Sequence, residues 1–193
     1  MGRDYDEFVA YLQANQVRFE ESNGGNLVRF GYNIEVGTIE VVVDFEHQGR
    51  IGFFSFLNIA VPLDRKSEAL ILANLFNESL NYGAIIVSQG RQLVYKIMLS
   101  TLDVKIQDRF WAEVIFRLWS ISRDIFPLFG RLLYNEEDAV KLFHEFLSQK
   151  ESDNELDNSP IAEDRKHKAH RSAADTNTEN LFGFDSEGWF LQN

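Results

Sequence analysis

The chain of 193 residues contains no cysteine. A disulfide framework, a thiolate metal site and a cysteine nucleophile are therefore excluded. Positive charge is also scarce, because 19 Lys and Arg stand against 30 Asp and Glu and leave a net charge of -11. This excess of negative charge opposes the attraction to phosphate that underlies most nucleic-acid binding, so DNA, RNA and anionic membranes are disfavoured as partners.

Sequence signals of export, membrane insertion and nucleotide chemistry are missing as well. No run approaches the roughly 18 apolar residues of a membrane span, and residues 1–6 lack the apolar stretch of a signal peptide. We therefore expect a soluble, cytoplasmic protein. There is no P-loop, dinucleotide fingerprint or Gly-x-Ser-x-Gly elbow. No constellation of catalytic residues remains, so we expect no enzymatic activity and no cofactor.

What the chain does contain is enough apolar material for a folded core, with 45% hydrophobic residues and 17 Phe. The pattern changes near Lys150. Residues 1–150 are predicted to form one domain, and residues 151–193 an acidic, mostly disordered tail with an aromatic terminal segment. The tail has 10 acidic and 4 basic residues and thus carries -6 of the net charge.

Residues 1–150 show two hydrophobic periods. Helical spacing predicts helices at 4–16, 65–82 and 106–125 and a last helix after Asn135, with Pro127 breaking the third and Asn135 and Asp138 capping the fourth. Alternation predicts strands at 17–21, 27–34, 38–46, 51–61, 84–87 and 93–99. The first four strands are expected to form an antiparallel meander and the last two a hairpin. The predicted fold class is α+β, an antiparallel sheet packed against helices.

The order of these elements and several local sequences resemble a known family. Residues 72–77, Leu-Ala-Asn-Leu-Phe-Asn, place two asparagines three apart on a helix, before a Gly-containing turn and a hairpin at 83–95. Over residues 4–134 the chain resembles the YbjN family, whose fold is similar to that of the type III secretion chaperones. The resemblance implies a homodimeric, non-enzymatic protein that binds other proteins or acts as a regulator. The extra C-terminal helix and the tail lie outside the resemblance.

The strand at 51–61 is apolar on both faces, whereas an antiparallel sheet commonly has one wetted face. Phe54 and Phe56 share one face, opposite Phe53 and Leu57. Such a strand is covered either by the chain's own late helices or by another protein. The sequence leaves both alternatives open, and Phe54 and Phe56 are candidate protein-binding residues.

The helix at 106–125 holds more large apolar side chains than one stripe can bury, among them Trp111, Ile115 and Trp119. This excess indicates assembly. We therefore expect a homodimer that forms through this helix and the face of Phe54 and Phe56.

The terminal segment of the tail adds four candidate protein-binding residues, which are Phe182, Phe184, Trp189 and Phe190. Large apolar side chains are costly to leave in water. The segment either docks on an apolar surface of its own or a neighbouring domain, or it is a frayed end with incidental aromatics.

Polar clusters give weaker signals. Glu40, Asp44 and Glu46 share one face of a strand, which we interpret as solvated. A second set lies along the helix at 65–82, where the side chains bond either to strand ends and loop backbone or across a dimer interface: Asn74, Asn77 and Asn81. The four histidines form no catalytic or metal-binding set: His47, His144, His167 and His170.

The sequence thus predicts a non-enzymatic, chaperone-like module that binds protein segments through an apolar surface, with an unidentified protein partner. The alternative is a small-molecule sensor or an enzyme with a pocket between sheet and helices. A third possibility is a scaffold that displays the tail. A pocket with a buried charged residue would favour a small molecule, and a flat apolar surface would favour protein binding.

Overall fold

The computed structural model describes residues 3–22, 24, 26–34, 37–45, 49–101 and 106–157, and the structural statements below refer to these residues. They form the predicted α+β fold, with a six-stranded antiparallel sheet and four helices. The helices are α1 (Arg3–Ala14), α2 (Lys66–Ser79), α3 (Asp108–Tyr134) and α4 (Ala139–Asp157). The strands are β1 (Phe19–Glu21), β2 (Leu27–Ile34), β3 (Gly37–Asp44), β4 (Arg50–Ala60), β5 (Ala84–Val87) and β6 (Gln92–Ser100).

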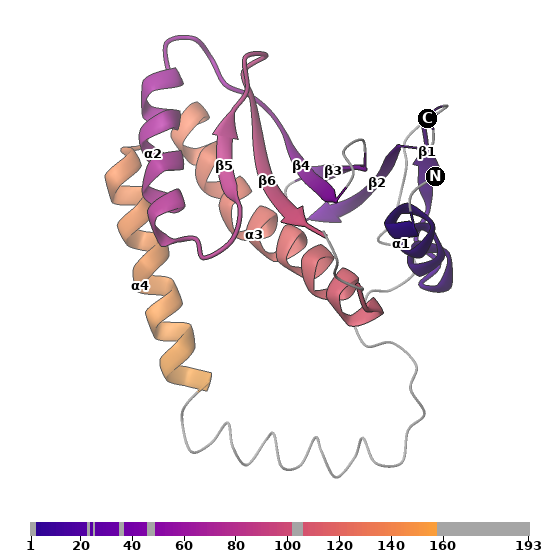
Figure 1. Cartoon of the computed structure of the whole chain (residues 1–193). Coiled ribbons are helices and arrows are strands. Elements are labelled where there is room, and N and C mark those ends of the chain that lie inside the picture. Colours follow the sequence, from indigo (N-terminus) through magenta and orange to yellow (C-terminus); the bar gives the residue numbers. More distant parts are fainter. Residues whose placement is uncertain are drawn as a thin grey trace.

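The strands lie in the order β1-β2-β3-β4-β6-β5, and every neighbouring pair is antiparallel. The predicted meander of β1 to β4 and the predicted hairpin of β5 and β6 are both confirmed. Figure 1 shows how they join, with β6 between β4 and β5. The sheet is therefore continuous across the molecule, with the short β1 and β5 at its two edges.

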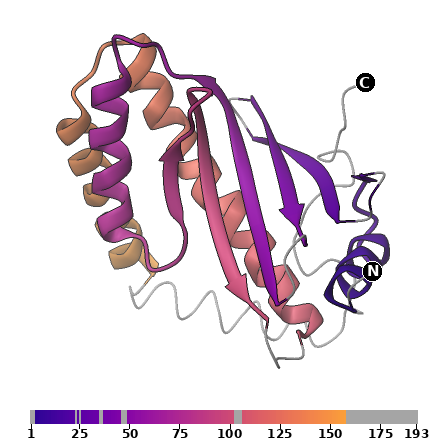
Figure 2. The same cartoon turned by 45° about the horizontal axis from the view of Figure 1, so that its top comes forward.

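The helices leave one face of the sheet open. Figure 2 shows α3 behind the sheet, α1 at one end, and α2 with α4 at the other. Phe53, Ser55 and Leu57 of β4 point toward α3 and are buried. α2 lies against the edge strand β5, and α4 packs on α2 and α3. The core thus fills the space between the sheet and α3 and extends under α2.

Aromatic contacts tie the layers together. Phe8 of α1 lies 5.9 Å from Phe53 of β4 and 5.0 Å from Trp111 of α3, measured between ring centroids. At the other end, the rings of Phe76 of α2 and Phe146 of α4 are 5.0 Å apart. Edge-to-face pairs at such distances contribute about 0.5 to 1.5 kcal/mol each beyond the area they bury. Each of these helices is therefore held to its neighbours through a ring.

The prediction that Pro127 breaks the third helix is wrong. α3 continues through Pro127 to Tyr134. A proline inside a helix costs about 3 kcal/mol, because it lacks an N–H and crowds the preceding turn. Leu128, Phe129 and Leu132 follow it and are buried, and full burial of each stabilises the fold by about 1.5 to 3 kcal/mol. This burial outweighs the proline penalty.

The last helix extends beyond the predicted domain. Asp138 is a capping residue, as predicted, because its Oδ1 accepts a backbone N–H of the first turn of α4 at 2.9 Å. Asn135, predicted as a second cap of this helix, instead follows the last residue of α3. α4 ends at Asp157, seven residues past Lys150. The first part of the predicted tail is therefore helical.

Candidate functional site

The face of the sheet away from α3 carries an apolar surface. Phe54 and Phe56 project from it, because they alternate along β4 with side chains that enter the core. We call this surface the outer sheet face and define it by the apolar residues that share the side: Val42, Phe54, Phe56, Ile86, Val94 and Met98. Figure 2 shows no described helix across it. The sequence left two alternatives for covering the apolar strand β4, the late helices or another protein. The late helix α3 covers only the face that carries Phe53 and Leu57, and the face of Phe54 and Phe56 has no described helix on it.

The Phe54 ring lies close against the sheet because Gly52 leaves room for it. A Cβ on Gly52 would come within 2.7 Å of the ring and 3.3 Å of the Met98 sulfur. The Lys96 ammonium lies 5.4 Å from the centre of the Phe54 ring, a cation–π contact. Met98 and Ile86 remain 49% and 39% exposed. The outer sheet face is therefore a packed apolar surface and not a set of isolated side chains.

Charged residues of both signs border this surface. Glu40 and Asp44 lie on β3 at one side of β4, and Lys96 lies on β6 at the other. Glu40 is exposed and Asp44 is partly buried, and both stand on an open face of the sheet, which is a poor setting for acid–base chemistry. Glu46, the third predicted member of the row, lies outside the described residues.

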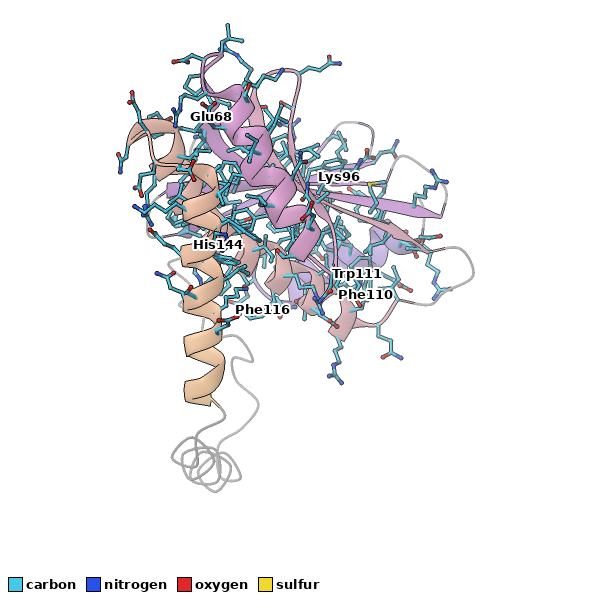
Figure 3. All side chains as sticks on the ribbon, turned by 90° about the vertical axis from the view of Figure 1, so that its left-hand side faces the viewer. Glu68, Lys96, Phe110, Trp111, Phe116 and His144 are labelled. Atoms are coloured by element: carbon cyan, nitrogen blue, oxygen red, sulfur yellow. The ribbon has the colours of Figure 1, made fainter. Side chains whose placement is uncertain are left out.

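A second exposed aromatic surface runs along α3. Phe116 is 47% exposed and its ring lies 5.9 Å from that of Trp119, one turn further on. Tyr82, from the loop after α2, is 59% exposed. We call the α3 ridge the two exposed ring–arginine groups along α3, which are Tyr82 with Arg117, and Phe116 and Trp119 with Arg123. Figure 3 looks onto α2 and α4 and labels Phe116 and Trp111 on α3.

The arginines of the α3 ridge stack on its rings. Arg117 Cζ lies 4.6 Å from the centre of the Tyr82 ring, and Arg123 Cζ lies 4.5 Å from that of Trp119. Each arginine also pairs with a carboxylate, Glu113 at 2.6 Å and Asp124 at 2.9 Å. These exposed pairs are weak, and a guanidinium has five N–H donors, so both arginines can bond to a further acceptor.

Three hydroxyl groups meet inside the core between the sheet and α3. Tyr32 of β2 donates to Ser122 Oγ of α3 at 3.3 Å, and Ser122 Oγ lies 2.8 Å from Ser55 Oγ of β4. Burial raises the pKa of Tyr32 to about 12, although the bonds from the two serines partly offset this. Both serines are fully buried. These hydroxyls fix the position of α3 on the sheet, and no described base is hydrogen-bonded to either serine to support nucleophilic catalysis.

A cavity of about 400 Å³ opens between the end of β6 and the first turn of α3. Its lining includes the apolar Leu99, Ile106 and Phe110 and the oppositely charged Arg109 and Glu113. Both charged side chains are exposed, so the cavity lacks the buried charge that would favour a small-molecule site.

The structure separates the predicted protein-binding residues that it describes into three groups. Trp111 and Ile115 are 0% and 8% exposed and belong to the core, so they offer no surface for a partner. Trp119 is partly buried and belongs to the α3 ridge. Phe54 and Phe56 are half-buried on the outer sheet face. The remaining four residues lie outside the described part of the chain: Phe182, Phe184, Trp189 and Phe190.

Several residues of both surfaces were not predicted from the sequence. Arg123 follows Trp119 by four residues, a spacing that places both side chains on one side of a helix and could have drawn attention to an aromatic–arginine pair. Tyr82 was placed in a helix, and no local pattern indicates its contact with Arg117. Met98 joins the outer sheet face only because β6 pairs with β4, which is a feature of the sheet order.

Metal binding finds no support in the described residues, which contain no cluster of three or more His, Cys, Asp or Glu side chains suited to an ion. His144 is exposed on α4, and the other three histidines lie outside that part of the chain. No helix of the described residues combines the length and the apolar character required to cross a membrane.

Comparison with known proteins adds no relative, because the sequence matches no protein-family model and no curated protein. The observed α+β architecture agrees with the fold class that the YbjN resemblance implies. Membership of that family stays a prediction.

Proposed function

We propose that this protein is a non-enzymatic protein-binding module of the YbjN and secretion-chaperone type, and that it acts as a homodimer. The observation that carries the proposal is the outer sheet face, an apolar surface that no described helix covers. Exposed contiguous apolar surface of this kind marks association sites on soluble proteins. A second copy of the chain is the partner that fits it best.

The charges around this face support a two-fold pairing of identical copies. A two-fold axis that is parallel to β4 and lies in the interface sets β3 of one copy over β6 of the other. Lys96 of one copy then lies over Val42 of the other, between the carboxylates of Glu40 and Asp44. The Phe54 and Phe56 rings of the two copies meet at the centre. The apolar middle thus has a charged rim of complementary sign.

Light scattering coupled to size exclusion at on the order of 50 µM tests the proposal. We expect the wild type to be a dimer and the Phe54→Thr/Phe56→Thr variant to be a monomer, since threonine keeps the strand propensity but removes the rings. Phe116→Gln is the matched control for an exposed aromatic elsewhere, and it should stay dimeric. A monomeric wild type, or a double variant that remains dimeric, would contradict the proposal.

A charge exchange tests the orientation of the two copies. Glu40→Lys and Lys96→Glu should each weaken the dimer, because each places like charges opposite one another. The Glu40→Lys/Lys96→Glu double variant should recover dimerisation. Recovery is specific to facing residues, so its absence with folded variants would remove the proposed axis.

The small-molecule alternative rests on the cavity between β6 and α3. A ligand that binds the folded state alone raises the melting temperature. We expect no specific shift with a panel of nucleotides, amino acids and divalent ions. A saturable shift that is lost on Arg109→Ala would favour a sensor over a protein-binding module.

A further inference from the structure

The α3 ridge combines exposed aromatic rings with positively charged side chains. This combination indicates the chemistry of the segment that would bind there. Arg117 Cζ and Arg123 Cζ lie 4.6 Å and 4.5 Å from the ring centres of Tyr82 and Trp119, so a ligand that reaches these rings also reaches two guanidinium groups. Lys150 of α4 adds a third cation beside Asp124. An aromatic segment that also carries carboxylates satisfies both features at once.

The chain itself contains a segment with this chemistry. Residues 172–193 carry four acidic residues and no Lys or Arg: Asp175, Glu179, Asp185 and Glu187. The same stretch holds the four aromatics that the sequence analysis singled out: Phe182, Phe184, Trp189 and Phe190. Each such ring gains about 1.5 to 3 kcal/mol when it is fully buried. The segment is therefore complementary to the α3 ridge in charge and in apolar character.

α4 passes beside the α3 ridge before it ends. Lys150 Nζ lies 3.7 Å from Asp124 Oδ2, and Asp124 follows Arg123 of the ridge directly. α4 ends seven residues after Lys150, at Asp157, which is about 10 Å further along the helix. The 23 residues from 158 to 180 span at most about 75 to 80 Å. They are ample to return the segment that follows to α3.

The outer sheet face suits this segment less well. Glu40 and Asp44 stand beside its rings on β3 and would repel an acidic chain. Arg29 of β2 and Lys96 of β6 lie on the same face and balance these two carboxylates. The ridge instead has Arg117, Arg123 and Lys150 beside Glu113 and Asp124, an excess of one positive charge. Charge therefore directs the acidic segment to the α3 ridge and leaves the sheet for a second copy.

We propose that residues 181–191 of this chain dock on the α3 ridge, with their aromatic side chains against Tyr82, Phe116 and Trp119 and the carboxylates of Asp185 and Glu187 on Arg117 and Arg123. The tail is thus an intramolecular occupant of a segment-binding surface, and a partner segment of the same acidic and aromatic chemistry must displace it. This role of the ridge rests on the proposed function, because it assumes that the protein binds protein segments. It does not depend on whether the protein is a dimer. Tethering favours the contact, because it makes docking an intramolecular event.

The absence of cysteine makes the test direct. Ser186→Cys supplies the full chain with a single attachment point for a nitroxide label, and amide signals near the label are broadened in nuclear magnetic resonance spectra. We expect loss of the amide signals of residues 116–123 in the oxidised sample and their return when the nitroxide is reduced. Added salt should weaken the effect, because ion pairs contribute to the contact.

Two full-length variants locate the contact on each side. Trp189→Ser/Phe190→Ser and Arg117→Glu/Arg123→Glu, each in the labelled chain, should restore the signals of residues 116–123. Arg18→Glu/Arg50→Glu makes the same change of charge at exposed arginines outside α3, and it should leave the broadening intact. Unbroadened ridge signals in the wild type, or broadening confined to the outer sheet face, would overturn the proposal.

The oligomeric mass of the same samples keeps this inference apart from the proposed dimer. A dimer whose ridge signals are unaffected by the label overturns the docking and leaves the dimer. A monomer whose ridge signals are broadened overturns the dimer and leaves the docking.

Discussion

The side-chain amide of Asn77 takes both backbone hydrogen-bonding groups of Ile85. Nδ2 of Asn77 donates to the Ile85 carbonyl oxygen at 2.9 Å, and Oδ1 accepts the Ile85 N–H at 2.7 Å. Ile85 lies in the edge strand β5, so these groups would otherwise face away from the sheet without a strand partner. Of the two roles considered for the asparagines, Asn77 therefore bonds to a strand. Asn74 and Asn81 are exposed.

Removal of this amide should weaken the edge of the sheet. Asn77→Ala leaves two part-buried backbone groups of Ile85 without a partner, and we expect the free energy of unfolding to fall by about 1 to 3 kcal/mol. Asn74→Ala, on the exposed side of the same helix, is the matched control and should change it by less than about 0.5 kcal/mol. Urea denaturation measures both. Equal effects would show that the asparagine bonds do not stabilise β5.

Two glycines should respond in opposite directions to alanine. Gly83 has a φ of +75°, and a Cβ there would lie 2.6 Å from the Lys96 carbonyl oxygen, so Gly83→Ala should cost about 1 to 3 kcal/mol through strain. Gly130 lies within α3 with nothing within 4 Å of its Cβ position. Gly130→Ala should stabilise by about 0.5 to 1 kcal/mol, because glycine loses more backbone entropy in a helix. Thermal denaturation that moves both variants in the same direction would refute this account.

The buried Tyr32 should make the fold sensitive to alkali. Its folded-state pKa of about 12 lies above the ordinary value of 10.0, so tyrosine ionises first in the unfolded chain. The contribution of Tyr32 is complete below pH 10 and is lost as the pH rises from 10 toward 12, by up to about 1.4 kcal/mol per pH unit. Tyr32→Phe should reduce the slope of stability against pH in this window. Tyr134→Phe, at a site that is 65% exposed, should not, and identical slopes in the two variants would contradict the prediction.

Local pattern was sufficient for most of the elements. β2 and β5 have the predicted bounds, because alternation and Gly-containing turns are both local signals. Pro127 was misjudged because its penalty is local, whereas the burial of Phe129 that outweighs it depends on α2 and the sheet. The excess of apolar residues on α3 was interpreted as an assembly surface, yet Trp111 is enclosed by Phe8 and Phe53. The hydrophobic periodicity of a sequence does not reveal that a helix is covered by other elements on more than one side.

The candidate surfaces were predictable only in part. Phe54 and Phe56 were identified from the alternation of β4, and they do share a face. The α3 ridge depends on the contact of Tyr82 with Arg117, residues that are 35 positions apart. Such a contact follows from the packing of α2 beside α3, which no periodicity encodes.

The placement of β6 beside β4 sets the order in which the sheet can form. Short turns connect strands β1 to β4. The pairing of β4 with β6, which begins at Ala60 and Gln92, instead joins segments that are separated in sequence by α2 and β5. Contacts of high sequence separation must overcome a larger entropy of loop closure, so they slow folding. The β4–β6 seam is therefore the expected kinetic bottleneck. Core truncations there, such as Ile97→Val, should slow refolding in stopped-flow measurements, and truncations in the meander, such as Val28→Ala, should chiefly accelerate unfolding. The strand that completes the sheet thus divides the chain into an early half and a late half within a single cooperative domain.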